Sequence, residues 1–156
     1  MSTSVLVVGA GPVGMTMASE LARYGVPVRI VDKAAQRTDK SKAIVLWSRS
    51  LEMLDRGGGA APFVKAGFKM SHVNFIAGDD KVVGRVGMDH VQSPHAYALM
   101  LPQSETERLL EERLRTLGIS VERETEVTSF TRGGDGVEAV LRRADGAARR
   151  RSWPAG

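Results

Sequence analysis

A glycine cluster between two apolar runs constrains the fold of this chain more than any other feature. The first run, Val5–Val8, leads directly into a G-x-G-x-x-G pattern over residues 9–14. The second run, Val28–Val31, ends at Asp32, eighteen residues after the last glycine of the pattern. A strand, a glycine turn, a helix and a second parallel strand form the βαβ unit that binds a dinucleotide. The sequence therefore predicts such a unit at its N-terminus.

Each residue type in this pattern has its own physical role. Gly9 allows the tight turn out of the strand, Gly11 lets the backbone approach a pyrophosphate, and Gly14 lets the helix pack closely on the strand. The helix N-terminus offers N–H groups and the positive end of its dipole to phosphates. Asp32 is expected to accept hydrogen bonds from ribose hydroxyls. The predicted phosphate-binding turn also includes Pro12 and Val13, at the start of the helix.

The composition is that of a globular protein and excludes several kinds of site. The 156 residues are 42% hydrophobic and 26% charged. The absence of cysteine excludes disulfides, thiolate metal ligands and cysteine nucleophiles. The three histidines have no metal-ligand spacing, so no metal site is predicted. No signal peptide or membrane span is recognisable, so a cytoplasmic location and no membrane partner are expected.

The excess positive charge is small and gathers near the C-terminus. The net charge is +4, and five arginines occupy positions 142, 143 and 149–151. Such a cluster could contact nucleic acid, but a solvated strand face is the favoured interpretation, and no nucleic-acid partner is expected. Phosphate affinity is predicted at the glycine turn instead.

After the βαβ unit the sequence predicts an antiparallel insertion. The first helix is expected to bury a stripe of Val13, Met17 and Leu21. A short helix with Leu51 and Leu54 facing inward is expected to end at the glycines 57–59. Alternating patterns over 72–77 and 82–86 flank a turn and predict a hairpin, and a further strand is expected over 96–101.

The last third of the chain predicts a helix followed by a three-stranded meander. Ser104 and Glu107 have the spacing of a capping box, and a leucine-rich helix follows it. A short strand over 119–121 is expected to return to the parallel sheet. Three strands over 125–131, 137–142 and 147–153 are joined by glycine-containing turns. The predicted fold class is α/β: a Rossmann-like βαβ unit with a parallel sheet, an inserted antiparallel region and a β-meander.

Together these features resemble the class A flavin-dependent aromatic hydroxylases, the family related to para-hydroxybenzoate hydroxylase and the polyketide hydroxylases. The resemblance covers the whole chain and rests on V-G-A-G-P-V-G over 8–14, on Lys42 and Ala43, on R-S-L-E over 49–52, and on L-P-Q-S-E-T-E over 101–107. The glycine pattern is shared with many nucleotide-binding proteins. Its combination with the helix at Gln103 is considerably more specific.

The resemblance implies that the cofactor is FAD and assigns roles to particular residues. The glycine turn would hold the pyrophosphate and Asp32 the adenosine ribose, where many relatives carry glutamate. Lys33 would line the adenine end, and Val127 would meet adenine through its backbone. Gln103 would bind the ribityl–phosphate region. Lys42 matches a place where relatives usually have arginine beside the flavin.

The implied activity is hydroxylation of a small aromatic, phenolic or polyketide substrate, with NADH or NADPH as reductant and O2 as oxidant. The cofactor performs that chemistry, so no catalytic acid or base is assigned from the sequence. Residues 63–101, approximately, would be the first strands of the substrate-binding sheet. The family's second flavin motif, Gly-Asp, has no counterpart. We therefore interpret residues 1–156 as the N-terminal part of an FAD-binding domain, expected to be inactive alone, with the remainder of the FAD and substrate domains absent.

Two alternatives share the N-terminal features. An NAD-dependent dehydrogenase domain would have the same glycines and the same acid, but it usually continues with alternating strands and helices. A non-catalytic dinucleotide-binding module is the other. The oligomeric state is open, with a homodimer of the full-length protein as one candidate.

Overall fold

The computed structural model describes residues 5–39, 44–134 and 136–154. The chain divides into two compact units. The first unit joins the residues up to Asp39 to those from Glu107 onward, and the second unit lies between them in sequence.

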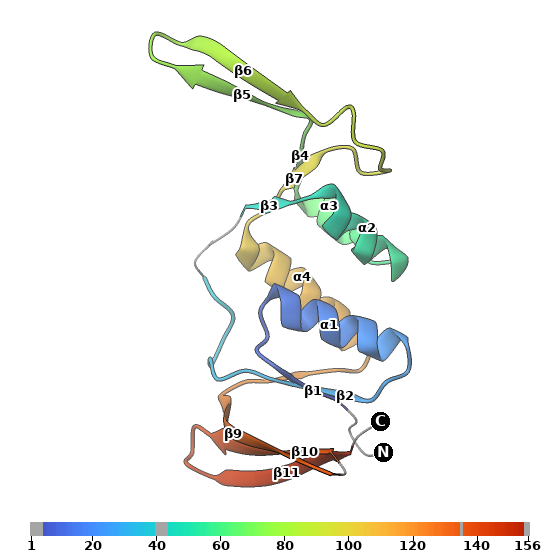
Figure 1. Cartoon of the computed structure of the whole chain (residues 1–156), viewed down its shortest axis with the longest axis vertical. Coiled ribbons are helices and arrows are strands. Elements are labelled where there is room, and N and C mark those ends of the chain that lie inside the picture. The colour runs from blue at the N-terminus through green and yellow to red at the C-terminus, as the bar shows by residue number, and fades with distance from the viewer. Residues whose placement is uncertain (1–4, 40–43, 135, 155–156) are drawn as a thin grey trace. The chain divides into compact units, whose positions relative to one another are not determined.

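The first unit is built on a parallel sheet of three strands, two of which are labelled in Figure 1. The strands are β1 (Val5–Val8), β2 (Val28–Val31) and β8 (Val121–Glu122), in the order β1-β2-β8. Helix α1 (Pro12–Arg23) connects β1 to β2, whose residues pair in parallel register. The predicted βαβ unit is therefore confirmed.

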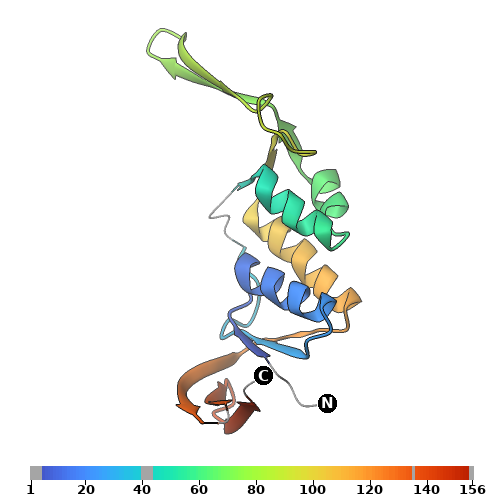
Figure 2. The same cartoon turned by 45° about the vertical axis from the view of Figure 1, so that its right-hand side comes forward.

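Helices cover one face of this sheet and a meander covers the other. The meander strands are β9 (Thr125–Gly133), β10 (Gly136–Arg143) and β11 (Ala148–Pro154). Helix α4 spans Gln103–Thr116, and its residues from Glu107 onward belong to this unit. Figures 1 and 2 show α1 and this part of α4 on the side of the sheet opposite to the meander strands. All pairings in the meander are antiparallel, as predicted. A core of Val31, Ala139, Leu141 and Trp153 joins the two sheets.

The buried stripe of α1 differs from the prediction. Met15 is fully buried and Ala18 and Ser19 share its face, whereas Val13 is 83% exposed and Met17 54% exposed. Positions 15, 18 and 19 follow the i, i+3, i+4 spacing of one helix face. A serine belongs on this face because its hydroxyl donates to the Met15 carbonyl at 2.8 Å, which satisfies its polar group in the interior.

The second unit contains a short antiparallel sheet and two helices. Strands β3 (Val45–Leu46), β7 (Ala98–Met100) and β4 (Phe68–Met70) lie in that order. Helices α2 (Ser48–Arg56) and α3 (Ala60–Ala66) precede β4. The sequence did not predict α3, because a seven-residue helix with one large buried side chain, Phe63, carries too little periodicity.

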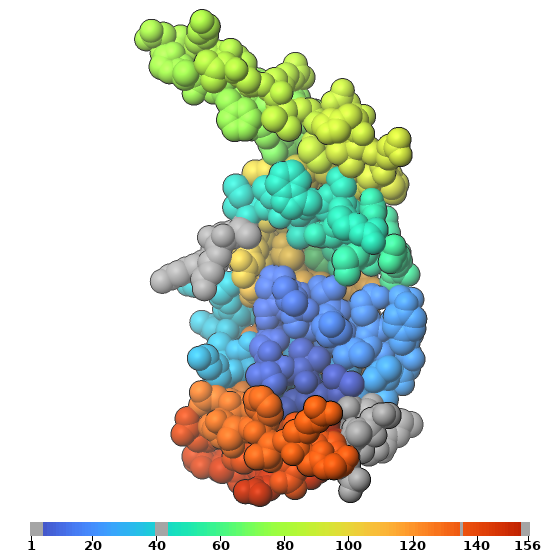
Figure 3. Space-filling view, in the orientation of Figure 1, coloured from blue at the N-terminus to red at the C-terminus, as the bar shows by residue number. Residues whose placement is uncertain are grey.

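A two-stranded hairpin extends the second unit. Its strands, β5 (His72–Ala77) and β6 (Lys81–Gly87), match the predicted hairpin closely. Asp79 and Asp80 have φ values of 54° and 57°, the left-handed conformation that tight hairpin turns require. Every residue of β5 is exposed, and Figure 3 shows this hairpin in green, standing away from the helices of its own unit.

The start of α4 also differs from the prediction. The helix begins at Gln103, and the carbonyl of Pro102 accepts the N–H groups of Glu105 and Thr106, each at 3.0 Å. Ser104 therefore lies within the first turn and is not the cap that the S-x-x-E spacing suggested. A proline directly before the helix marks its start more reliably here, since proline fits the beginning of a helix and cannot continue one.

Candidate functional site

The glycine turn carries the chain from the end of β1 across to α1. Gly9 has a φ of 98°, a conformation that other residues rarely adopt, and its N–H donates to the Val31 carbonyl at 2.8 Å. The turn is thus attached to the end of the neighbouring strand. This attachment holds the first turn of α1 at the carboxyl edge of the parallel sheet, the edge where open α/β sheets bind their ligands.

Gly14 and Gly11 are needed for two different reasons. A Cβ at Gly14 would lie 2.0 Å from the carbonyl oxygen of Gly9, so only glycine allows the helix to approach the turn this closely. A Cβ at Gly11 would meet no atom within 4 Å. The space beside Gly11 is therefore open, as a pyrophosphate approaching the backbone requires.

The N-terminus of α1 has no side-chain cap. Gly11 occupies the N-cap position in an extended conformation, and Pro12 begins the helix. A helix N-terminus has N–H groups without intrahelical partners and carries a partial positive charge. An anion bound there would satisfy the N–H groups that a capping side chain satisfies elsewhere.

The carboxylate of Asp32 lies directly against the glycine turn. One oxygen accepts the Ala10 N–H at 2.6 Å and the other accepts the Ala34 N–H at 2.8 Å. The main chain of Asp32 is fixed as well, since its N–H donates to Glu122 and its carbonyl accepts from Thr125. The residues predicted to bind the phosphates and the residue predicted to bind the ribose therefore lie next to each other, although they are separated in sequence.

A hollow of about 500 Å³ is lined by the loop that follows Asp32 and by the meander. Lys33 lines it, and so do Glu124 and Arg143. Glu124 has a φ of 53°, a left-handed conformation that costs a non-glycine residue about 1–2 kcal/mol. Hydrogen bonds to Ala34 and from Ala144 hold it there.

Three other predicted cofactor residues are Lys42, Gln103 and Val127. Lys42 lies outside the described residues. Gln103 is the partly buried first residue of α4 and belongs to the second unit. Val127 packs its partly buried side chain against the core between the two sheets.

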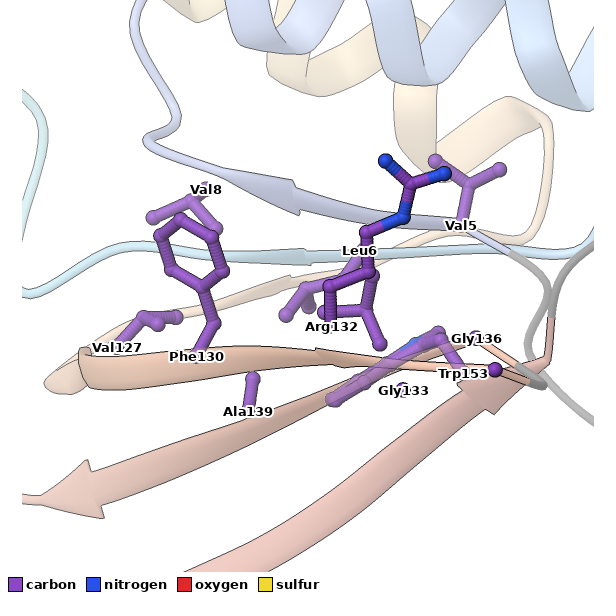
Figure 4. A pocket seen from close by; sticks show the side chains of 12 residues that line it. Val5, Leu6, Val8, Val127, Phe130, Arg132, Gly133, Gly136, Ala139 and Trp153 are labelled. Atoms are coloured by element: carbon purple, nitrogen blue, oxygen red, sulfur yellow. The ribbon is translucent and has the colours of Figure 1, made fainter.

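Val127 also lines an apolar cavity of about 560 Å³ between β1 and the meander. Figure 4 shows Val8 and Phe130 facing each other at one end of this cavity and Arg132 standing near Leu6 and Val5. Val8 is 61% exposed and Phe130 is 73% exposed. The apolar lining continues the face of β1 and does not include the glycine turn.

One polar cluster in the second unit was not predicted from the sequence. His95 is 9% exposed; its Nε2 pairs with the Asp55 carboxylate, and its Nδ1 shares a 2.9 Å hydrogen bond with the Tyr97 hydroxyl. Burial raises the pKa of the Tyr97 phenol, and the charge of Asp55 adds to this effect. Asp55 lies in the last turn of α2, and His95 and Tyr97 precede β7, so only the folded chain brings them together.

Replacing His95 by alanine should destabilise the protein by about 1–3 kcal/mol, because the Tyr97 hydroxyl would lose its partner in a partly buried site. His90→Ala is the matched control: His90 is exposed, and its loss should cost no more than about 0.5 kcal/mol. Urea denaturation of both variants measures the difference. Equal losses in the two variants would mean that the cluster does not stabilise this unit.

Comparison with known proteins identifies the family. A family model described as an FAD binding domain matches residues 2–151. An uncharacterised aromatic compound monooxygenase of Bacillus subtilis is 35% identical over 149 residues, which cover 96% of this chain and 29% of that protein. The 6-methylpretetramide 4-monooxygenase of Streptomyces rimosus is 38% identical over 141 residues, which cover 89% of this chain and 25% of that protein.

The structural comparison agrees with the sequence comparison. The anhydrotetracycline hydroxylase of Streptomyces rimosus superposes with a TM-score of 0.81 at 30% identity, over 96% of this chain and 30% of that structure. The chain thus spans less than a third of the length of these relatives. Among the described residues, no helix has both the length and the apolar character needed to cross a membrane. The match over residues 2–151 confirms the resemblance seen in the sequence, and the chain belongs to the FAD-binding-domain family of the flavin-dependent aromatic monooxygenases.

Proposed function

We propose that this chain supplies the adenosine-diphosphate half of an FAD site in a monooxygenase that hydroxylates aromatic, phenolic or polyketide substrates with NADH or NADPH and O2. The observation that carries this proposal is the fit of the glycine turn to a dinucleotide. The backbone at Gly11 is open, the helix behind it has no side-chain cap, and Asp32 presents its carboxylate at the same turn.

In this proposal the residues of the first unit bind and orient the cofactor. The pyrophosphate lies at Gly11 and the N-terminus of α1, where N–H groups and the helix dipole favour negative charge. Asp32 accepts the ribose hydroxyls, and Lys33 lines the hollow that takes the adenine. The further proposed contacts to the cofactor are made by Gly9, Pro12, Val13, Gly14, Lys42, Gln103 and the backbone of Val127.

FAD is the preferred dinucleotide because of the family match and because of the strand pattern. The family model is described as an FAD binding domain. The β5–β6 hairpin and the β9–β11 meander interrupt the alternation of strands and helices that an NAD-dependent dehydrogenase domain would continue. When bound, the flavin supplies the redox chemistry with reductant and O2, and the protein contributes binding, orientation and exclusion of water.

We further propose that the 156-residue chain alone does not catalyse hydroxylation of a substrate, because it spans only 25–29% of the length of these curated relatives. The test is oxygen consumption with added FAD, NADH or NADPH, and a panel of phenols. The expected rate equals that of free FAD under the same conditions. A sample that retained stoichiometric yellow flavin and produced a hydroxylated phenol would contradict this proposal.

A further inference from the structure

Three arginines of the meander point toward the parallel sheet. Arg149 pairs with Leu141 across the β10–β11 ladder, and Arg151 pairs with Ala139. Directly paired residues of an antiparallel ladder project on the same face, and Leu141 and Ala139 belong to the core between the sheets. Arg143, which pairs with the buried Thr125, follows Leu141 by two positions and so lies on this inner face as well.

These arginines meet an ion pair of the parallel sheet. Arg29 of β2 and Glu122 of β8 form two hydrogen bonds, Nε to Oε1 at 2.5 Å and Nη2 to Oε2 at 2.7 Å. A small hollow of about 40 Å³ is lined by this pair and by Arg143, Arg149 and Arg151. Four guanidinium groups therefore surround one carboxylate. Arg29 already pairs with that carboxylate, so among the described residues that line this hollow there is an excess of three positive charges.

The outer face of the same strands shows that this imbalance is local. Arg142 pairs with Glu126 at 2.6 Å, and Arg150 pairs with Glu138 at 3.5 Å. Within residues 5–39, 44–134 and 136–154, none of the three inner arginines forms an ion pair of this kind. The outward-facing arginines of β10 and β11 thus have acidic partners, whereas the inward-facing ones have none within the part of the chain that the structure describes.

The electrostatics of Glu122 support this arrangement. Its hydrogen bonds with Arg29 lower the pKa of the Glu122 carboxyl, and the charges of Arg143 and Arg151 lower it further. Arg143 and Arg151 of the meander therefore lie close enough to Glu122 to stabilise its charged form, as Arg29 does. The positive charges gathered around this one carboxylate repel one another, and a further anion at the hollow would reduce that repulsion.

We propose that this hollow binds a small oxyanion with at least two negative charges, a phosphate or pyrophosphate group. Guanidinium groups bind phosphate oxygens through paired, charge-assisted hydrogen bonds, and several arginines on one anion give specificity as well as affinity. At about 40 Å³ the hollow is too small for a nucleobase. The three arginines remain exposed to solvent beside the hollow, so a single-stranded oligonucleotide is the competing ligand that the test includes. The site lies on the face of the sheet opposite α1 and is separate from the glycine turn.

The test is a calorimetric titration of the whole chain with inorganic pyrophosphate at about 0.1 M salt, where diffuse attraction beyond about 10 Å is screened. The double variant Arg149→Gln/Arg151→Gln removes two inner charges, and Arg142→Gln/Arg150→Gln removes two outer charges as the matched control. We expect the inner variant to bind at least about tenfold more weakly, and the outer variant to stay within about twofold of wild type. Thermal melts without ligand verify that both variants fold.

A second titration with ADP distinguishes the source of the anion. ADP affinity that falls in the inner variant shows that the site accepts the terminal phosphate of a nucleotide, whereas an effect on pyrophosphate alone shows a site for the free anion; both support the proposal. Equal weakening by the two double variants would overturn it, since only net charge would then matter. It is overturned as well if pyrophosphate does not bind, if the inner variant binds it normally, or if a single-stranded oligonucleotide binds where pyrophosphate does not.

Discussion

Gly14→Ala is expected to destabilise the protein by about 3 kcal/mol, a large fraction of the stability of a small domain. The new Cβ would lie 2.0 Å from the Gly9 oxygen and 3.1 Å from the Gly9 carbonyl carbon. These are backbone atoms of a turn that hydrogen bonds attach to β2, so no flexible side chain can yield. Either α1 or the glycine turn must move. Urea denaturation of variant and wild type measures the loss.

Gly11→Ala is the matched control within the same turn. Gly11 has an extended backbone and an open surrounding, so alanine should cost less than about 1 kcal/mol, mainly through poorer N-cap propensity. Its methyl group would still occupy the space proposed for the pyrophosphate and should weaken FAD binding. Similar destabilisation by both substitutions would contradict the distinction between close helix packing at Gly14 and ligand access at Gly11.

Met15→Ala is expected to cost about 2–5 kcal/mol, because Met15 is fully buried on the face of α1 that packs into the first unit. Met17→Ala makes the same chemical change two positions later, where the side chain is 54% exposed, and should cost less than about 1 kcal/mol. Thermal or urea denaturation of the pair measures the contrast. If Met17→Ala were the more damaging variant, the buried face of α1 would be the one that the apolar spacing of the sequence suggested.

Elements whose residues carry their own conformational preference could be predicted from the sequence. The βαβ unit follows from β-branched runs around a glycine turn, and the hairpin and meander follow from alternating patterns with turn residues between them. In contrast, helix α3 and the exact start of α4 could not be predicted from the sequence. A short helix has little periodicity, and the S-x-x-E spacing at Ser104 competes with Pro102, which the folded chain uses as the helix start.

The candidate site could be predicted where it is local and not where it depends on tertiary structure. The glycines and Asp32 belong to one βαβ unit, so their spacing implies their proximity. Asp55 and His95 are forty residues apart and meet only because α2 packs near β7 in the second unit. The inner and outer arginines of β11 alternate in sequence, and only the register with β10 shows which of them face the parallel sheet.

The central claim is that the glycine turn and Asp32 hold the adenosine-diphosphate half of FAD. Titration of the chain with FAD, followed by flavin fluorescence anisotropy with ADP as competitor, tests it most directly. We expect weak, saturable binding that ADP displaces. Asp32→Ala should weaken it at least about tenfold, because hydrogen bonds to a charged group contribute about 1.5–3 kcal/mol, and Asp32→Glu should retain it. FAD binding that ADP does not displace, or that Asp32→Ala leaves unchanged, would contradict the claim.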